Sequence, residues 1–124
     1  MKITKVTKDK QWIGVDLDGT LAKYDQFLGA SHIGEPIPKM LTRVKRWIEN
    51  GKTVKIFTAR AANKGKDKDE AINAIKAWSK KHIGCELEIT CTKDRYMTEL
   101  WDDRAIQVKK NEGVRVASGM LDRC

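Results

Sequence analysis

Two aspartates stand two residues apart in the segment 14–24, which reads GVDLDGTLAKY. Side chains of an extended strand alternate between faces, so Asp16 and Asp18 emerge on the same side if the strand geometry persists to its end. Two carboxylates held this close repel each other unless a cation or a shared proton relieves them. Gly19 permits positive φ, and the N–H groups around the Gly19-Thr20 turn can cradle an oxyanion. The pattern predicts a site for phosphate and a hard cation such as Mg²⁺.

Polar residues also end two later apolar runs. Thr58 and Arg60 close the run TVKIFTAR, and Asp102 and Asp103 follow the apolar pair LW. Ligands of parallel sheets bind outside the carboxyl ends of the strands, so these side chains should meet at one edge. We expect Asp102 and Asp103 to complete the shell of the cation. For Thr58 the alternative role is a helix N-cap, and Arg60 contacts either a substrate phosphate or solvent.

The elements that must position these residues alternate between strands and helices. Short apolar runs predict strands at 12–18, 53–58, 87–90, 99–103 and 105–108. A helical period that starts at Ile37 predicts an amphipathic helix ending at Asn50-Gly51, and a second helix is carried by Ile72, Ile75 and Trp78. Residues 22–36 have no sustained period and predict a loop or small flap.

This order of elements predicts right-handed crossovers and a mostly parallel sheet that is covered on both faces. The fold class is therefore α/β, a Rossmann-like three-layer α/β/α sandwich. The sequence shows no linker and no internal repeat, so we expect residues 1–124 to form a single domain.

Composition limits the class of protein. Of the 124 residues, 40% are hydrophobic and 34% charged, and no apolar run is long enough to span a bilayer. With no signal peptide and no metal-ligand spacing among Cys85, Cys91 and Cys124, we expect a cytoplasmic protein with reduced thiols and no membrane partner. The net charge of +8 favours phosphate-bearing partners, and surface solubility is an equally good explanation of it.

The run Asp16-Leu17-Asp18-Gly19-Thr20-Leu21 resembles the first signature of the haloacid dehalogenase superfamily. Thr58 after its apolar strand resembles the second signature, Lys93 is the candidate for the third, and Asp102-Asp103 resemble the fourth. The resemblance extends over roughly residues 12 to 108 in the order of the family. It implies the Rossmann-like fold and a Mg²⁺-dependent phosphatase.

The resemblance also implies roles for the residues. Asp16 would be the nucleophile that becomes an aspartyl phosphate, and Asp18 the general acid and then the general base. The residues implied to contact substrate are Thr58, Lys93, Gly19, Thr20 and Arg60. The implied ligands of Mg²⁺ are Asp16, the main-chain carbonyl of Asp18, and one or both of Asp102 and Asp103.

The short segment 22–36 leaves no room for a large cap domain, so we expect an open site. The architecture is similar to the capless phosphatase half of polynucleotide kinase-phosphatases, and to small stand-alone members of the superfamily in phages and bacteria. The expected substrate is a nucleotide or a phosphorylated nucleic-acid end, with another phosphomonoester still open. The alternative is a phosphate or nucleic-acid binding module without turnover, which has no need of both Asp16 and Asp18.

Overall fold

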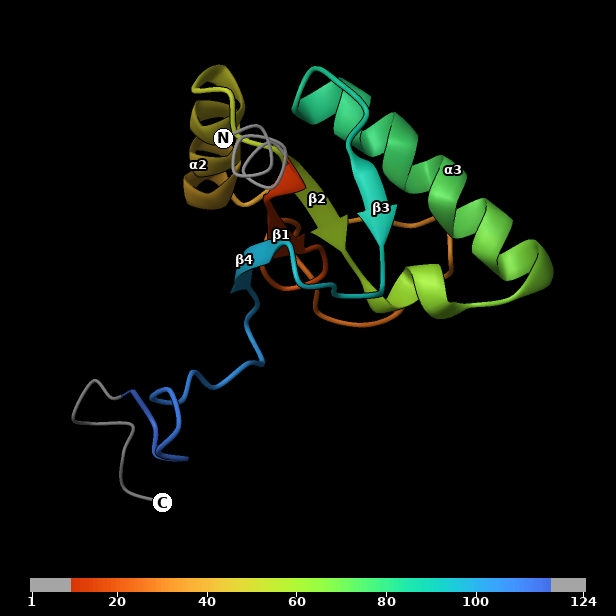
Figure 1. Cartoon of the computed structure of the whole chain (residues 1–124). Helices are drawn as coiled ribbons and strands as arrows, with labels where there is room; N and C mark the ends of the chain where they lie inside the picture. Colours follow the sequence, from red (N-terminus) through yellow and green to blue (C-terminus); the bar gives the residue numbers. More distant parts are fainter. Residues whose placement is uncertain (1–9, 117–124) are drawn as a thin grey trace.

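A four-stranded parallel sheet organises the chain. The computed structural model describes residues 10–116, and Figure 1 shows the sheet with its helices. The strands are β1 (Trp12–Asp16), β2 (Val54–Phe57), β3 (Glu88–Thr90) and β4 (Met97–Trp101), in the spatial order β3-β2-β1-β4. All three strand pairs are parallel, which confirms the predicted α/β Rossmann-like class.

β1 holds the centre of the sheet, between β2 and β4. Its first four residues are buried, as expected for a strand covered on both faces by other groups. The register pairs Ile13 with Val54 and Val15 with Ile56 on one side. Asp16 is the last residue of β1, so it stands where the buried strand meets solvent at the carboxyl edge.

Two helices connect the strands. α2 (Pro38–Glu49) joins β1 to β2, and η1 (Ala59–Ala62) with α3 (Gly65–His82) joins β2 to β3. Pro38 opens α2 at a position where a missing N–H costs no helical hydrogen bond. The helices agree with the two predicted amphipathic segments.

Both helices pack on the same face of the sheet. Met40 and Val44 of α2 and Ile75 and Trp78 of α3 belong to one buried cluster with the β1 and β2 residues Ile13, Val15, Val54 and Ile56. Two consecutive right-handed crossovers in one direction place both helices on the same side. Figure 1 shows α2 to the left of the strands and α3 to their right.

The opposite face has a covering of a different kind from the predicted helical layer. Residues 91–96 lead from β3 back to β4 without a helix, and the main-chain N–H of Trp12 donates to the Tyr96 carbonyl at 3.0 Å. The Trp12 indole, only 2% exposed, donates from Nε1 to Asp94 Oδ1 at 3.0 Å. Within residues 10–116 the helical layer therefore lies on one face, and the crossing segment covers the other in part.

The predicted strand at 105–108 is wrong. In that stretch Val108 forms only an isolated antiparallel bridge to Arg115, and the chain projects away from the sheet. β4 is an edge strand, and residues 105–108 have no neighbouring strand with which to extend the sheet. β-propensity without a cross-strand partner does not make a strand.

Two further predictions concern the whole chain. Across the described range, no helix has the length and apolar character needed to cross a membrane. Cys85 and Cys91 are free and exposed, and Cys124 lies outside the described residues.

Candidate functional site

Three carboxylates meet at the carboxyl edge of the sheet. Asp16 ends β1, while Asp102 and Asp103 follow β4, and the pairing of Val15 with Trp101 brings the two strand ends side by side. One oxygen from each of Asp16, Asp102 and Asp103 lies within 4.8 Å of the other two. The parallel pairing of β1 with β4 thus joins residues that are more than 80 positions apart in the chain.

The electrostatics of this cluster centre on Asp16. The pKa of Asp16 is raised from its ordinary value of 3.8 to about 7, with burial as the largest cause and a hydrogen bond to Asp103 as the next. The negative charges of Asp102 and Asp103 act in the same direction, while the hydrogen bond from Thr20 opposes them. Near neutral pH the carboxylates of this cluster therefore repel one another, and they cannot neutralise their negative charge among themselves.

Thr20 connects the two halves of the cluster. Its Oγ accepts from the Asp103 N–H at 2.9 Å and lies 3.3 Å from Asp16 Oδ2 and 3.2 Å from Asp103 Oδ1. A hydroxyl has one hydrogen, so Thr20 donates to only one of these carboxylates at a time. The sequence predicted a substrate contact for Thr20, and the structure instead sets its hydroxyl between two carboxylates.

Gly19 lets the carboxylates approach the turn. Its φ is +92°, a backbone conformation that residues other than glycine rarely adopt. A Cβ placed on Gly19 would lie 2.7 Å from Asp103 Oδ2, so any other residue here would force the Asp103 carboxylate to shift. Glycine thus suits both the backbone conformation and the close approach of Asp103.

Asp18 faces a different partner from Asp16. Arg60 donates from Nε to Asp18 Oδ2 and from Nη2 to Asp18 Oδ1, both at 2.9 Å. A third donor of the same guanidinium, Nη1, reaches the main-chain carbonyl of Ala30 in the flap at 2.9 Å. The arginine is only 8% exposed, so the predicted choice between substrate phosphate and solvent is replaced by an internal ion pair.

Thr58 sits at the end of β2, where sequence reasoning placed it. It is 2% exposed, its N–H donates to the Thr90 carbonyl at 2.9 Å, and its Oγ accepts from the Arg60 N–H at 3.1 Å. It is thus the N-cap of η1, which was the alternative role considered for it. Because the hydroxyl accepts that bond, its hydrogen remains available to a group in the adjoining cavity.

A cavity of about 650 Å³ opens beside these residues. Its lining combines Asp16, Asp18, Thr58 and Arg60 with the pair Asp102 and Asp103. The lining also includes residues that the sequence analysis did not propose, namely Tyr24, Phe27, Gly29, Ala30, Ala59, Asn63, Asp67, Glu70 and Arg104. Arg104 could have been predicted, because it directly follows the Asp102-Asp103 pair. Nothing in the sequence around Asp67 and Glu70 of α3 indicates that they line this cavity.

Lys93 lies elsewhere. It is exposed in the segment that crosses from β3 to β4, outside the lining of the cavity. The cationic side chain predicted there for the third signature is thus not part of the cavity wall. Arg104 is an exposed cation in that lining, and its N–H donates to Asp102 Oδ1 at 2.8 Å.

The donor set fits a hard divalent cation. All three side chains of the cluster offer carboxylate oxygens, the ligand type that Mg²⁺ prefers, and they lie at or just after the ends of two neighbouring strands. Burial, and then the neighbouring carboxylates, raise the pKa of Asp16, so three negative charges together are unfavourable here without a cation. A bound cation would offset these charges, and Asp18 would contribute to holding it only through its main-chain carbonyl, because its carboxylate is paired with Arg60.

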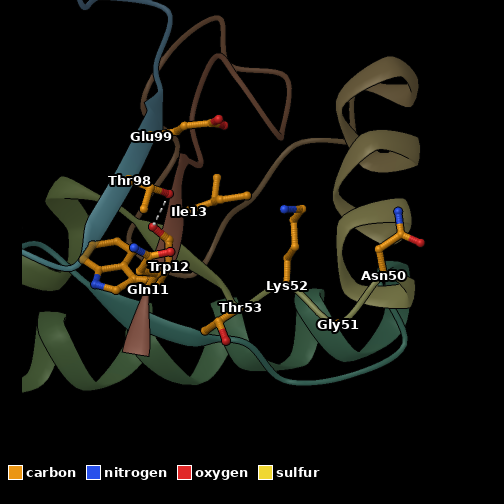
Figure 2. A pocket seen from close by; sticks show the side chains of 9 residues that line it. All are labelled: Gln11, Trp12, Ile13, Asn50, Gly51, Lys52, Thr53, Thr98 and Glu99. Carbon is orange, nitrogen blue, oxygen red and sulfur yellow. Dashed lines mark hydrogen bonds between the residues drawn. The ribbon is translucent and has the colours of Figure 1, made fainter. Parts of the chain in front are cut away.

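A second cavity lies at the other end of the strands. It has about 350 Å³ and is lined by the starts of β1 and β4 and by the loop between α2 and β2. Figure 2 shows Lys52 and Glu99 at separate places on its wall, with Thr98 hydrogen-bonded to the Trp12 carbonyl at 3.2 Å. It gathers no carboxylate cluster, so the carboxyl edge is the stronger candidate.

Comparison with known proteins supports the fold. No family model matches the sequence, and no curated protein matches it. A solved structure of a conserved protein from Bacteroides thetaiotaomicron is similar, with 23% sequence identity, a TM-score of 0.50, and coverage of 76% of each chain. At that identity the likeness extends to the arrangement of the elements alone, and it agrees with the α/β Rossmann-like class.

Proposed function

We propose that this protein is a Mg²⁺-dependent phosphomonoester hydrolase of the haloacid dehalogenase type, acting on nucleotides or phosphorylated nucleic-acid ends. The observation that carries the proposal is the meeting of Asp16, Asp102 and Asp103 within 4.8 Å at the mouth of a cavity that also holds Asp18 and Thr58. These are the positions at which the resemblance stated above implies a nucleophile, metal ligands, a proton donor and a phosphate contact.

The bound cation would supply positive charge where phosphate meets the carboxylates. A carboxylate about 4 Å from a phosphate dianion experiences roughly 8 kcal/mol of repulsion at an effective dielectric constant near 20. Asp16, Asp102 and Asp103, whose oxygens lie within 4.8 Å of one another, would hold the ion. Without such compensation the repulsion alone would slow the reaction by about six orders of magnitude.

The chain's own residues would then carry the reaction in two steps. An Asp16 oxygen attacks phosphorus, the bond to the leaving oxygen breaks, and Asp18 gives that oxygen a proton. Water next attacks the aspartyl phosphate, Asp18 takes the proton from that water, and inorganic phosphate leaves. The Thr58 hydroxyl and the Arg104 guanidinium are placed along the cavity to donate to phosphoryl oxygens.

The cavity supports a nucleotide-like substrate. The flap contributes two aromatic side chains, Tyr24 and Phe27, which remain exposed while they line the cavity, and aromatic rings are surfaces on which bases stack. The net charge of +8 favours substrates that carry phosphate. A single nucleotide and the end of a longer strand both meet these conditions.

The test is release of inorganic phosphate from an aryl phosphate, mononucleotides and 3′- or 5′-phosphorylated oligonucleotides. We expect release that requires Mg²⁺ and that Asp16→Asn abolishes, while Glu88→Gln, which changes an exposed carboxylate of β3, leaves it intact. No release from any member of the panel by folded, Mg²⁺-saturated protein would refute the hydrolase.

One observation favours the alternative, a phosphate or nucleic-acid binding module without turnover. Lys93, which the resemblance implies as a contact of the transferring phosphate, is exposed and lies outside the lining of the cavity. Binding of a phosphorylated oligonucleotide without phosphate release, unaffected by Asp18→Asn, would establish that module instead.

A further inference from the structure

Arg60 makes three hydrogen bonds that join two separate parts of the chain. Two of its N–H groups donate to the carboxylate of Asp18, just after β1, and a third donates to the carbonyl of Ala30 in the flap, all at 2.9 Å. The flap is the segment 22–36 between β1 and α2. A single guanidinium therefore connects a proposed proton donor to the loop that borders its cavity.

The local structure holds Arg60 in place for this task. Its main-chain N–H donates to the Thr58 hydroxyl, and the residue belongs to η1, which follows β2. Arg60 is 8% exposed, and an unpaired charge is strongly unfavourable when it is buried away from water. The planar fork of arginine satisfies both carboxylate oxygens at once, which a lysine ammonium cannot do in the same geometry.

We propose that Arg60 is a positioning residue that couples the flap to Asp18, so that the carboxylate is held toward the cavity only while the flap is closed over it. The coupling runs through one side chain: if the flap withdraws the Ala30 carbonyl, the guanidinium loses its third partner and its hold on Asp18 loosens. The reverse also holds, since loss of the Asp18 carboxylate frees Arg60 and with it the flap. The catalytic part of this inference rests on the proposed function of Asp18.

The first experiment measures the coupling without any reaction. Tyr24 and Phe27 are 46% and 63% exposed, so chymotrypsin can cut the flap where it moves. We expect Arg60→Met and Asp18→Asn each to raise the rate of flap cleavage about tenfold, because each removes a charge-assisted hydrogen-bonded pair. The double variant should be cut no faster than either single variant.

Additive rates in the double variant would overturn the coupling, since independent residues contribute independently. Arg46→Met is the matched control, because Arg46 is an exposed arginine of α2 and should leave flap cleavage at the wild-type rate. Circular dichroism confirms that each variant is folded before it is cut, and Arg60→Lys serves as a second variant that keeps the buried charge.

The second experiment uses phosphate release. We expect Arg60→Ala to lower kcat by about tenfold to a hundredfold, with the Mg²⁺ concentration for half-maximal activity unchanged, because Arg60 does not contact the Asp16, Asp102 and Asp103 cluster. Added methylguanidinium should restore part of the activity of Arg60→Ala, and Arg60→Lys should stay well below wild type. If Arg60→Ala lost activity only because it unfolds, added methylguanidinium would not restore that activity.

The outcomes separate the two proposals. If the wild-type protein is active and the Arg60 variants have the same kcat, the positioning role is overturned and the proposed hydrolase function is not affected. Inactive wild type refutes the hydrolase, and the cleavage experiment then decides whether Arg60 couples the flap to Asp18.

Discussion

The charge of Asp16 should make the metal-free protein less stable as the pH rises. Its pKa is about 7 in the folded protein and 3.8 when unperturbed, so the folded state binds the proton more tightly than the unfolded state between these values. For an acid whose pKa is raised on folding, the protonated form favours the folded state. Stability is therefore greatest at low pH within this window and falls as pH rises through it.

The magnitude follows from the same two pKa values. The difference between 3.8 and about 7 corresponds to at most ~4 kcal/mol. Asp16 is only half-buried, and solvent screens part of the effect, so we reduce this to about 2 kcal/mol. About half of that change lies between pH 5 and 8, because the fall has already begun below pH 5. A change of about 1 kcal/mol moves a urea midpoint by roughly 0.5 M in a protein of this size.

The assay is urea unfolding in a chelator at pH 5 and pH 8, for wild type and Asp16→Asn. We expect the wild-type midpoint to fall by about 0.5 M from pH 5 to pH 8, and the Asp16→Asn midpoint to change less. At pH 8 the variant should be more stable than wild type, because it removes one charge from the cluster. Mg²⁺ should reverse the order, and at a hundred times its dissociation constant it adds about 2.7 kcal/mol to a protein that binds it.

Glu88→Gln provides the control, because Glu88 pairs with Lys55 on β2 and does not touch the cluster. It should keep the wild-type dependence on pH. A wild-type midpoint that is level or rises between pH 5 and 8, or an Asp16→Asn protein with the same slope as wild type, would refute the reasoning about Asp16.

Two substitutions test the geometry around the cluster, and a third tests the crossing segment between β3 and β4. Gly19→Ala sets a methyl group against the Asp103 carboxylate at φ +92°, so we expect about tenfold weaker Mg²⁺ binding by calorimetry, and unchanged affinity would contradict the contact. Thr20→Val should weaken Mg²⁺ binding by a similar factor while Thr20→Ser does not, since only the hydroxyl bridges the carboxylates; equal affinities would dismiss that bridge. Trp12→Phe removes the hydrogen bond to Asp94 and should lower the free energy of unfolding in urea by about 1 kcal/mol. An unchanged free energy of unfolding would show that this hydrogen bond does not stabilise the crossing segment.

The sequence was sufficient to predict the elements that carry strong periodic patterns. The helix expected from Ile37 to Asn50-Gly51 is observed as Pro38–Glu49, because apolar spacing and proline and glycine at its ends act locally. The gathering of polar residues at the carboxyl edge followed from one general rule on parallel sheets. That rule brought Asp16 together with Asp102 and Asp103, and their chemical roles stay predictions.

Contacts between distant parts of the chain were not predictable in the same way. The pairing of Arg60 with Asp18 joins residues 42 positions apart, and no local pattern distinguishes a buried arginine from an exposed one. Lys93 was placed at the site by resemblance alone, and the short crossing segment that carries it lies outside the cavity lining. The helical covering predicted for both faces of the sheet was also wrong for one face, because the connection between β3 and β4 is too short to carry a helix.

The position of β4 in the chain also bears on how the protein assembles. A growing chain that ends at β3 already contains Asp16 and the flap, but the residues that crowd Asp16 with negative charge arrive only with β4. Pairing β1 with β4 joins residues about 85 positions apart, and such distant pairings are slow to form. This late step also gathers like charges, so we expect the docking of β4 to limit the rate of refolding and to become faster when Mg²⁺ is present.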